Sequence, residues 1–403
     1  MGIYLNPGKS MFEEALEADI YIDKTKMIQY LNSVVKTRMK YVSVSRPRRF
    51  GKSMAADMIC AYYDRNADSK DLFLQTELSR CEPVVCENRT INWDSYLGAF
   101  DVIRLVMTDF MDDNTSVRDM LKYLNDEVTE ELMETFPEVK FGNRINLRIV
   151  LNKIFATTKR QFIIVIDEWD AVFRKCKNDE EGQELYLDFL RDCLKDKPYV
   201  ALAYITGILP IKKYGEHSAL NMFDEYSMMH PMQMAEFTGF TTSEVLELCK
   251  EYNMKYEEIS SWYDGYVISG IIPKDKREEY REGTYTDHKV AIYSPLSVVK
   301  AMTTGVIKNY WNKTETYEAL AEYIKRNYAG LKEAVALLMN GGRLVIDTST
   351  YKNDMTTFTG RDDVLSLLVH LGYLGFDDEK SEVFIPNNEI LDEFKTSTKV
   401  IFC

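Results

Sequence analysis

The feature that most constrains the fold is a run of apolar residues at positions 162–166, Phe-Ile-Ile-Val-Ile, that ends directly in Asp167 and Glu168. A continuous, mostly β-branched run is typical of a strand covered on both faces, as in parallel sheets flanked by helices. Ionised carboxylates at the end of a buried strand cost free energy unless cations or hydrogen-bond donors compensate them. The run therefore predicts a buried strand that delivers two acids to a polar site.

Strand and helix patterns alternate around this run. We expect further strands at residues 41–45, 100–107 and 199–205, and helices at residues 54–63, 116–135, 146–157 and 184–194. The alternation predicts a three-layer α/β domain with a mainly parallel sheet. Ligands of such sheets bind beyond the carboxyl ends of the strands, where Asp167, Glu168 and Thr206 would lie.

Residues 46–53 read Arg-Pro-Arg-Arg-Phe-Gly-Lys-Ser and stand between an expected strand and an expected helix. This context indicates a P-loop, G-x-x-x-x-G-K-[ST], in which Arg46 occupies the position of the first glycine. In such loops the backbone N–H groups hold phosphates, the lysine neutralises their charge and the hydroxyl binds Mg²⁺. We therefore assign Lys52 to phosphate and Ser53 to Mg²⁺. A basic helix N-terminus without a ligand is the alternative interpretation.

The two acids complete the predicted site. Asp167 is expected to hold Mg²⁺ through water, and Glu168 to polarise the attacking water as general base. Taken alone, both acids are equally compatible with capping a helix. The sequence has no Asn-Lys-x-Asp motif for reading guanine, which favours ATP. The residues predicted to bind the nucleotide are Arg48, Arg49, Phe50, Gly51, Lys52, Ser53, Met54 and Thr206.

Two polar residues near the predicted site, Thr206 and Arg191, each allow two interpretations. Thr206 either senses the γ-phosphate or only marks the exit of its strand before Gly207. Arg191 is either a finger that acts on a neighbouring copy or a surface arginine.

Composition and charge narrow the class of protein. The formal net charge of −14 argues against bulk binding of nucleic acid or anionic membranes. Residues 1–60 nevertheless carry ten Lys and Arg against six Asp and Glu, which indicates either a bound anion or a solvated face. Seven cysteines without a Cys-x-x-Cys pair, no apolar signal region and no apolar stretch that spans a bilayer predict a cytoplasmic protein. The four scattered histidines predict no structural metal site.

The pattern changes near residue 235, and we predict three regions. Residues 1–235 form the ATPase core, residues 236–300 a helical lid, and residues 301–403 a helical and winged-helix-like region. The last assignment rests on a predicted helix followed by two short strands. Residues 377–403 carry seven acids against three lysines, which opposes DNA binding.

As a set, these motifs resemble the bacterial AAA-ATPase-like family. The matching segments are residues 21–25, 46–53, 166–170, 205–207, 262–266, 293–295, 372–374 and 385–387. Trp169 stands where a tyrosine is more usual. The resemblance implies an ASCE-type P-loop NTPase fold with a helical lid. Family members commonly continue into a PD-(D/E)XK nuclease-like domain; none is expected in this sequence, so nuclease activity is not carried over.

The leading hypothesis is therefore a Mg²⁺-dependent ATPase that couples hydrolysis to lid movement, with Lys52 and Glu168 as catalytic residues. The Arg46 substitution motivates the alternative of a nucleotide-binding switch or scaffold with little turnover. A DNA-linked module acting through the C-terminal region is a third hypothesis. The expected partners are ATP and a second copy of the chain or another protein, with no membrane, and nucleic-acid binding through this chain alone is not expected.

Overall fold

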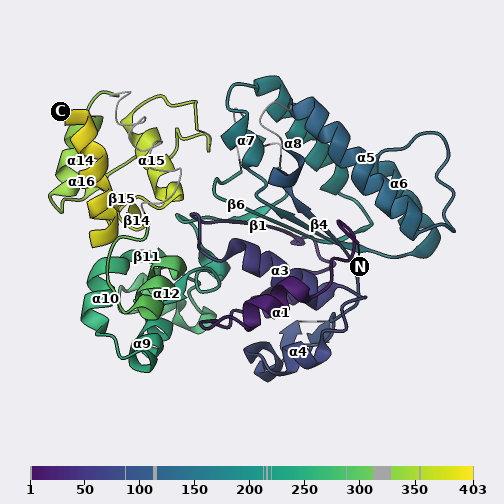
Figure 1. The fold of residues 1–403 in the computed structure, drawn as a ribbon, viewed down its shortest axis with the longest axis horizontal. Coiled ribbons are helices and arrows are strands. Elements are labelled where there is room, and N and C mark those ends of the chain that lie inside the picture. The colour runs from purple at the N-terminus through teal and green to yellow at the C-terminus, as the bar shows by residue number, and fades with distance from the viewer. Residues whose placement is uncertain are drawn as a thin grey trace. The chain divides into compact units, whose positions relative to one another are not determined.

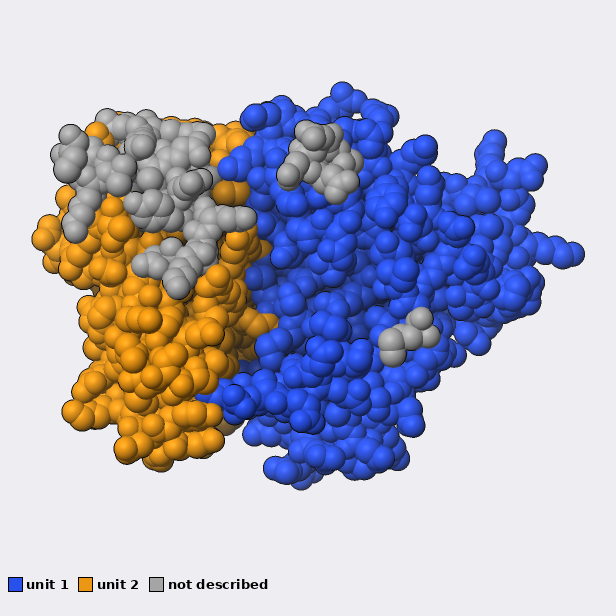
Figure 2. Space-filling view, viewed as in Figure 1, with its two compact units in different colours: residues 1–44, 52–207, 211–225 blue, residues 45–51, 208–210, 226–403 orange. Residues whose placement is uncertain are grey.

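The computed structural model describes residues 2–86, 88–111, 116–211, 213–214, 217–218, 220–286, 288–311, 328–353 and 355–402. The chain divides into two compact units, coloured separately in Figure 2. Unit 1 comprises residues 1–44, 52–207 and 211–225, and unit 2 comprises residues 45–51, 208–210 and 226–403. The region boundaries expected at residues 235 and 300 stay predictions.

Unit 1 is built around the central sheet. Its strands are β1 (Tyr41–Ser45), β2 (Val84–Cys86), β3 (Arg89–Ile91), β4 (Asp101–Val106), β5 (Phe162–Asp167), β6 (Val200–Gly207), β7 (Lys213–Tyr214), β8 (His217–Ser218) and β9 (Asp224–Tyr226). Its helices are α1 (Ser10–Leu16), α2 (Met27–Val34), α3 (Lys52–Tyr63), α4 (Lys70–Leu74), α5 (Val117–Thr135), α6 (Leu147–Thr158), α7 (Ala171–Lys175) and α8 (Glu180–Leu194).

The five-stranded sheet has the order β4-β5-β6-β1-β9. Strand β5 pairs parallel with β4 and with β6, which confirms the predicted mainly parallel α/β sheet. Every residue of β5 and β6 is buried, as the continuous apolar runs predicted. In Figure 1, α5, α6 and α8 cover one face of the sheet and α1 and α3 the other, giving three layers.

Local side-chain caps explain where the long helices begin. The hydroxyl of Ser116 accepts from the amide of Asp119 at the start of α5, and the side chain of Asn146 accepts from Ile149 at the start of α6. Such caps satisfy amides that have no partner within the helix. Helix α3 begins at Lys52, two residues earlier than predicted, so Lys52 belongs to its first turn.

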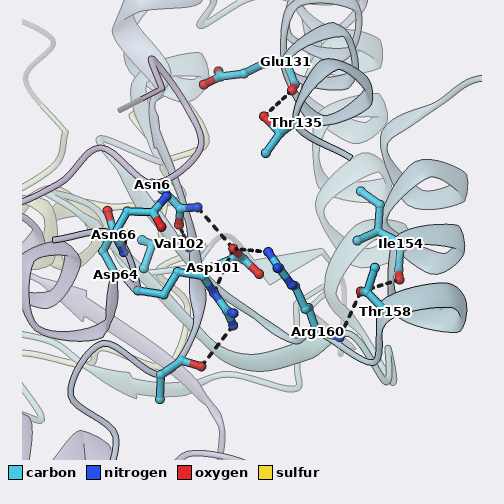
Figure 3. A network of polar contacts seen from close by, with 12 residues as sticks. Asn6, Asp64, Asn66, Asp101, Val102, Glu131, Thr135, Ile154, Thr158 and Arg160 are labelled. Carbon is cyan, nitrogen blue, oxygen red and sulfur yellow. Dashed lines mark hydrogen bonds and ion pairs between the residues drawn. The ribbon is translucent and has the colours of Figure 1, made fainter. Parts of the chain in front are cut away.

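The N-terminal segment covers the β4 edge of the sheet. The amide of Asn6 donates to Val102 O over 2.7 Å, and the side chain of Asn6 accepts from Val102 N over 2.8 Å. Asp101, at the start of β4, is fully buried and accepts from Asn6 Nδ2 over 3.2 Å (Figure 3). Its carboxylate also pairs with Arg65 Nε at 3.0 Å and Arg160 Nη1 at 3.6 Å. An exposed sheet edge invites pairing with other chains, and this segment blocks it.

Unit 2 combines helices with two small antiparallel sheets. Its strands are β10 (Phe240–Thr241), β11 (Tyr266–Ser269), β12 (Lys289–Tyr293), β13 (Leu344–Val345), β14 (Gly375–Asp377) and β15 (Glu382–Phe384). Its helices are α9 (Thr242–Glu251), α10 (Tyr256–Tyr263), α11 (Arg277–Arg281), α12 (Pro295–Thr304), α14 (Leu331–Met339), α15 (Arg361–Leu371) and α16 (Asn388–Phe402). The sheets have the orders β10-β12-β11 and β13-β15-β14.

Several predicted details of unit 2 are present. Thr241 and Glu244 form the expected capping box of α9, and Pro295 begins α12. The segment expected as a helical lid also contains the β10-β12-β11 sheet. Helix α15 is followed by the antiparallel β14–β15 pair, but the winged-helix assignment stays a prediction. No helix among the described residues is both long and apolar enough to cross a membrane.

Replacing Asp101 with Asn is expected to destabilise unit 1. The change removes a buried charge that two arginines and one amide contact, and a hydrogen bond to a charged group contributes about 2 kcal/mol. Urea unfolding is expected to show a loss of about that size, whereas the exposed change Glu130→Gln stays within about 0.5 kcal/mol of the wild type. Equal stability of the two variants would mean that the network does not anchor the N-terminal segment.

Candidate functional site

The sheet register brings the ends of β5 and β6 together. Asp167 closes β5 and pairs in register with Thr206 of β6. Asp167 is 2% exposed and Thr206 is buried. The hydroxyl of Thr206 donates to Val44 O over 2.9 Å, so this donor binds the backbone of β1. The structure thus places Thr206 beside Asp167, as the sequence predicted, with its hydroxyl proton already used.

Hydrogen bonds fix the backbone of the turn that follows β5. The amide of Glu168 donates to Asp167 Oδ1 over 2.9 Å, and the amide of Trp169 donates to Thr206 O over 3.1 Å. The hydroxyl of Tyr186 donates to Trp169 O over 2.8 Å. Glu168 itself has a φ of +50°, in the left-handed region that side chains with a Cβ rarely adopt. This fixed turn presents the Glu168 side chain, which is 41% exposed, at the carboxyl end of β5.

Because Gly207 has no Cβ, the side chains of this turn can pack against it. A Cβ at Gly207 would lie 2.5 Å from Asp170 Oδ1 and 2.8 Å from Trp169 Cδ1, so neither side chain could keep its position. Trp169 is fully buried and packs edge-on against Phe173, with ring centroids 5.4 Å apart. The tryptophan ring at position 169, larger than the ring of the more usual tyrosine, is therefore accommodated in the core of unit 1.

Arg174 joins two acids of the same turn. Its Nη2 lies 2.8 Å from Glu168 Oε2, and its Nε lies 3.1 Å from Asp170 Oδ2. Burial alone would lower the pKa of Arg174, but the charges of Asp170 and Glu168 outweigh it and raise that pKa. Sequence reasoning missed this arginine. The spacing of Asp170 and Arg174, four residues apart where β5 gives way to a helix, is the signal that points to it.

Lys52 is an ammonium buried next to acids. Its residue is 8% exposed, and burial lowers its pKa to about 8, opposed by the charges of Asp170 and then Asp167. A buried ammonium is costly unless an anion compensates it. Ser53 follows Lys52 in the first turn of α3 and is exposed. The structure therefore brings Lys52 together with Asp167, as predicted, and adds Asp170 as a further acid.

A second ion pair lies beside Asp167. Arg104 of β4 pairs with Asp57 of α3, and its Nη2 lies 4.0 Å from Asp167 Oδ2. Burial raises the pKa of Asp57 to about 6, while the charge of Arg104 opposes this shift. No local pattern in the sequence predicts this pair, because its members come from two elements far apart along the chain. Asp167 thus lies near two cationic side chains, Arg104 of β4 and Lys52 of α3.

Residues 45–51 belong to unit 2, and Arg46 is fixed there. Its side chain is fully buried and donates through Nη1 to Tyr226 O over 3.0 Å and through Nη2 to Met234 O over 3.1 Å. Arg46 therefore binds backbone carbonyls, where a usual P-loop would have a glycine. These two hydrogen bonds give a structural reason why position 46 is an arginine and not a glycine.

The rest of the loop separates into buried and exposed residues. Phe50 is fully buried and packs edge-on against Tyr266, with ring centroids 5.8 Å apart. Arg49 is exposed, and Met54 of α3 is 43% exposed. Gly51 has a φ of +83°, which only glycine adopts at low cost. Of the residues predicted to contact nucleotide, Phe50 thus has a packing role in unit 2; Arg48 is half-buried.

Two variants measure the backbone strain at Glu168. Glu168→Ala and Glu168→Gly both remove the carboxylate, but only Gly relaxes the left-handed backbone. Glu168→Gly is expected to be more stable than Glu168→Ala by about 1 kcal/mol in urea unfolding. Equal stabilities, or a more stable Ala variant, would contradict a strained turn.

A family model matches just over half of the chain. The model of the AAA-ATPase-like family, described as "Predicted AAA-ATPase", matches residues 8–215. A curated relative, "Uncharacterized protein in vnfD 5'region" from Azotobacter chroococcum mcd 1, is 21% identical over 335 residues. That alignment covers 80% of this chain and 56% of the relative, so the chain spans little more than half of the relative's length.

Comparison with solved structures gives low overall similarity. The ORC2 protein of Aeropyrum pernix in its ADPNP–ADP complexes has a TM-score of 0.33 and 9% identity, covering 98% of this chain and 99% of that one. Cdc6p of Pyrobaculum aerophilum has a TM-score of 0.29 and 10% identity, covering 99% of each chain. The family match includes Lys52, Asp167 and Glu168 as well as the loop before them. The chain therefore belongs to the AAA-ATPase-like family of predicted AAA-ATPases.

Proposed function

We propose that the chain binds ATP and hydrolyses it beyond the ends of β5 and β6, where Lys52 and Glu168 act on the phosphates and the attacking water. The observation that carries this proposal is the buried ammonium of Lys52 in the first turn of α3, next to Asp167 and Asp170. A desolvated lysine at a helix N-terminus is suited to phosphate, because the ammonium and the helix amides both favour an anion.

The donor atoms suit Mg²⁺. Asp167 supplies carboxylate oxygen and Ser53 a hydroxyl, and Mg²⁺ prefers such oxygen ligands while taking the rest of its shell from phosphates and water. Among the described residues there is no group of three or more His, Cys, Asp or Glu side chains that could hold a metal ion. An ion held mainly by its substrate fits this arrangement. When bound, Mg²⁺ would neutralise charge on the phosphates.

Glu168 is suited to the role of general base. Its carboxylate is partly exposed, lies one residue beyond Asp167 and is presented by a turn that three backbone contacts fix. A base must meet the attacking water in a defined place, and a rigid turn provides that placement. Lys52 holds the phosphates while Glu168 takes the proton of the water.

The order of the strands supports the ASCE-type P-loop fold that the family resemblance implies. Strand β6 lies between β1, which leads to the loop, and β5, which carries the acids. We further propose that nucleotide state is coupled to movement of the lid region, residues 236–300. We also propose that the protein is bacterial and cytoplasmic, and that it associates with itself or with another protein.

One observation favours a second candidate function, a nucleotide-binding switch with little turnover. Arg174 already engages the carboxylate of Glu168 at 2.8 Å. A base held by an arginine is less available to water, so slow hydrolysis by the isolated chain would follow. Tight ATP binding without measurable phosphate release by the wild type would favour this alternative.

Two substitutions test the assigned roles. Lys52→Ala is expected to abolish saturable ATP binding, because the phosphates lose the cation that neutralises them. Glu168→Gln is expected to bind ATP as tightly as the wild type and to lower turnover by about 100-fold or more, the usual loss for a general base. ATP affinity by calorimetry and phosphate release with Mg²⁺ give both readouts.

A matched control comes from an exposed ion pair. Arg118 pairs with Glu181 at 3.0 Å, and both side chains are largely exposed. Arg118→Gln should therefore leave binding and turnover unchanged. Wild-type turnover in Glu168→Gln, or undiminished ATP binding in Lys52→Ala, would refute the assigned roles.

A further inference from the structure

Tyr266 of β11 joins segments of unit 2 that carry separate sequence motifs. Its ring packs edge-on against Phe50, with ring centroids 5.8 Å apart. Its hydroxyl donates to Gly372 O, at the C-terminal end of α15, over 2.6 Å. Tyr266 is 1% exposed, so both contacts are shielded from water. The proposed hydrolysis uses neither the motif of residues 262–266 nor that of residues 372–374.

Gly372 also lies close to the loop that precedes Lys52. A Cβ at Gly372 would be 2.9 Å from Pro47 Cβ and Cγ and 3.0 Å from Trp311 Cη2. Real Cβ atoms essentially never approach other atoms more closely than 3.0 Å, so a larger residue would move the proline ring. The φ of Gly372 is +87°, which only glycine adopts at low cost. Pro47 can therefore pack at this place because position 372 has no side chain.

The backbone of Phe50 has an anchor of its own. Its carbonyl accepts from Gly239 N over 3.2 Å, and a Cβ at Gly239 would be 3.3 Å from Phe50 Cδ1. The side chain of Arg46 adds its two hydrogen bonds to backbone carbonyls. The loop is thus fixed near its start by Arg46, next to it by Pro47, and near its end by Phe50. All of these contacts lie within unit 2.

The anchoring ends at Gly51, the last residue of the loop in unit 2. Apart from the chain neighbours of Gly51, no heavy atom of the described residues lies within 4 Å of a Cβ built there. The next residue, Lys52, begins α3 and is the proposed phosphate ligand. The loop is therefore packed on unit 2 up to Phe50 and meets open space beside the helix N-terminus that would receive phosphate.

We propose that Tyr266 and Gly372 are positioning residues that hold the loop of residues 45–51 in the conformation that binds phosphate. The inference rests on the proposed binding of ATP and adds the residues of unit 2 that set its affinity. A loop that is already ordered loses less conformational entropy when phosphate binds, so ATP binds more tightly. Loosening either contact lowers the affinity, while Asp167 and Glu168 keep their own supports in unit 1.

Tyr266→Phe tests the hydrogen bond to Gly372, because it keeps the ring against Phe50. ATP affinity, measured by calorimetry with Mg²⁺, is expected to fall about threefold to tenfold. The value of kcat at saturating ATP is expected to stay within about twofold of the wild type, because only uniform binding energy is lost. The matched control Tyr263→Phe removes a similar hydrogen bond, from a fully buried tyrosine to Lys308 O over 2.8 Å, and should leave the affinity unchanged.

Gly372→Ala tests the contact with Pro47. The alanine Cβ would press on the proline ring, so ATP is expected to bind about tenfold more weakly or worse. Gly305→Ala is the matched control, because Gly305 also caps the end of a helix of unit 2, α12, with a φ of +65°. A Cβ at Gly305 meets no described atom within 4 Å. Both variants carry the strain of a left-handed alanine, but only Gly372→Ala is expected to lose affinity.

Hydrogen exchange gives a readout that does not depend on turnover. The amide of Tyr373 donates to Leu368 O over 2.8 Å at the end of α15. A non-hydrolysable ATP analogue with Mg²⁺ is expected to slow exchange of the amides of residues 372–374 in the wild type, because coupling between two sites is reciprocal. The slowing is expected to be smaller in Tyr266→Phe. Binding of the analogue without any slowing in the wild type would contradict the link between the loop and Gly372.

The outcomes separate this inference from the function on which it rests. If the wild type binds ATP and Lys52→Ala does not, but Tyr266→Phe and Gly372→Ala bind it as tightly as the wild type, the positioning role is refuted while the ATP site stands. Equal losses of affinity in the variants and their controls would refute it too, since they would report a general loss of stability. Where Gly372→Ala does not fold, the comparison of Tyr266→Phe with Tyr263→Phe decides. If the wild type does not bind ATP, the proposed function fails and the inference fails with it.

Discussion

The structure of the site depends on how a buried lysine and a nearly buried arginine share three acids at the carboxyl end of β5 in unit 1. Lys52, Asp167 and Asp170 are buried, and Arg174 bridges from Asp170 to the more exposed Glu168. Each of these charges would be costly alone and is tolerated because the others compensate it. We propose that a nucleotide phosphate would join these charges as a further anion, which is how the cluster would serve as a binding site.

The surrounding fold keeps this cluster rigid. Parallel pairing of β5 with β6 sets Asp167 beside Thr206, and the Trp169 backbone is bonded both to Thr206 and to Tyr186. Asp101 starts the neighbouring strand β4 and ties it to the N-terminal segment, and Arg104 within the same strand pairs with Asp57 of α3. Rigid strands and a fixed turn are the supports that a defined placement of reacting groups requires. Glu168, the residue proposed to act on the attacking water, itself has a left-handed backbone conformation.

The sequence predicted the parts of this account that rest on local pattern. The apolar run before Asp167, the helix after Gly51 and the parallel α/β class all follow from short-range periodicity and were confirmed for the fold. Local patterns could not predict contacts between residues far apart along the chain. These are the strand order, the Arg104–Asp57 pair and the Asn6–Asp101 contact. Arg174 was visible as a spacing of four from Asp170, but only the turn geometry shows that it reaches Glu168.

A structure of the protein with Mg²⁺ and a non-hydrolysable ATP analogue tests the central claim most directly. The account predicts that Lys52 Nζ lies within hydrogen-bond distance of a phosphate oxygen. A nucleotide bound away from Lys52 would contradict the proposed ATP site.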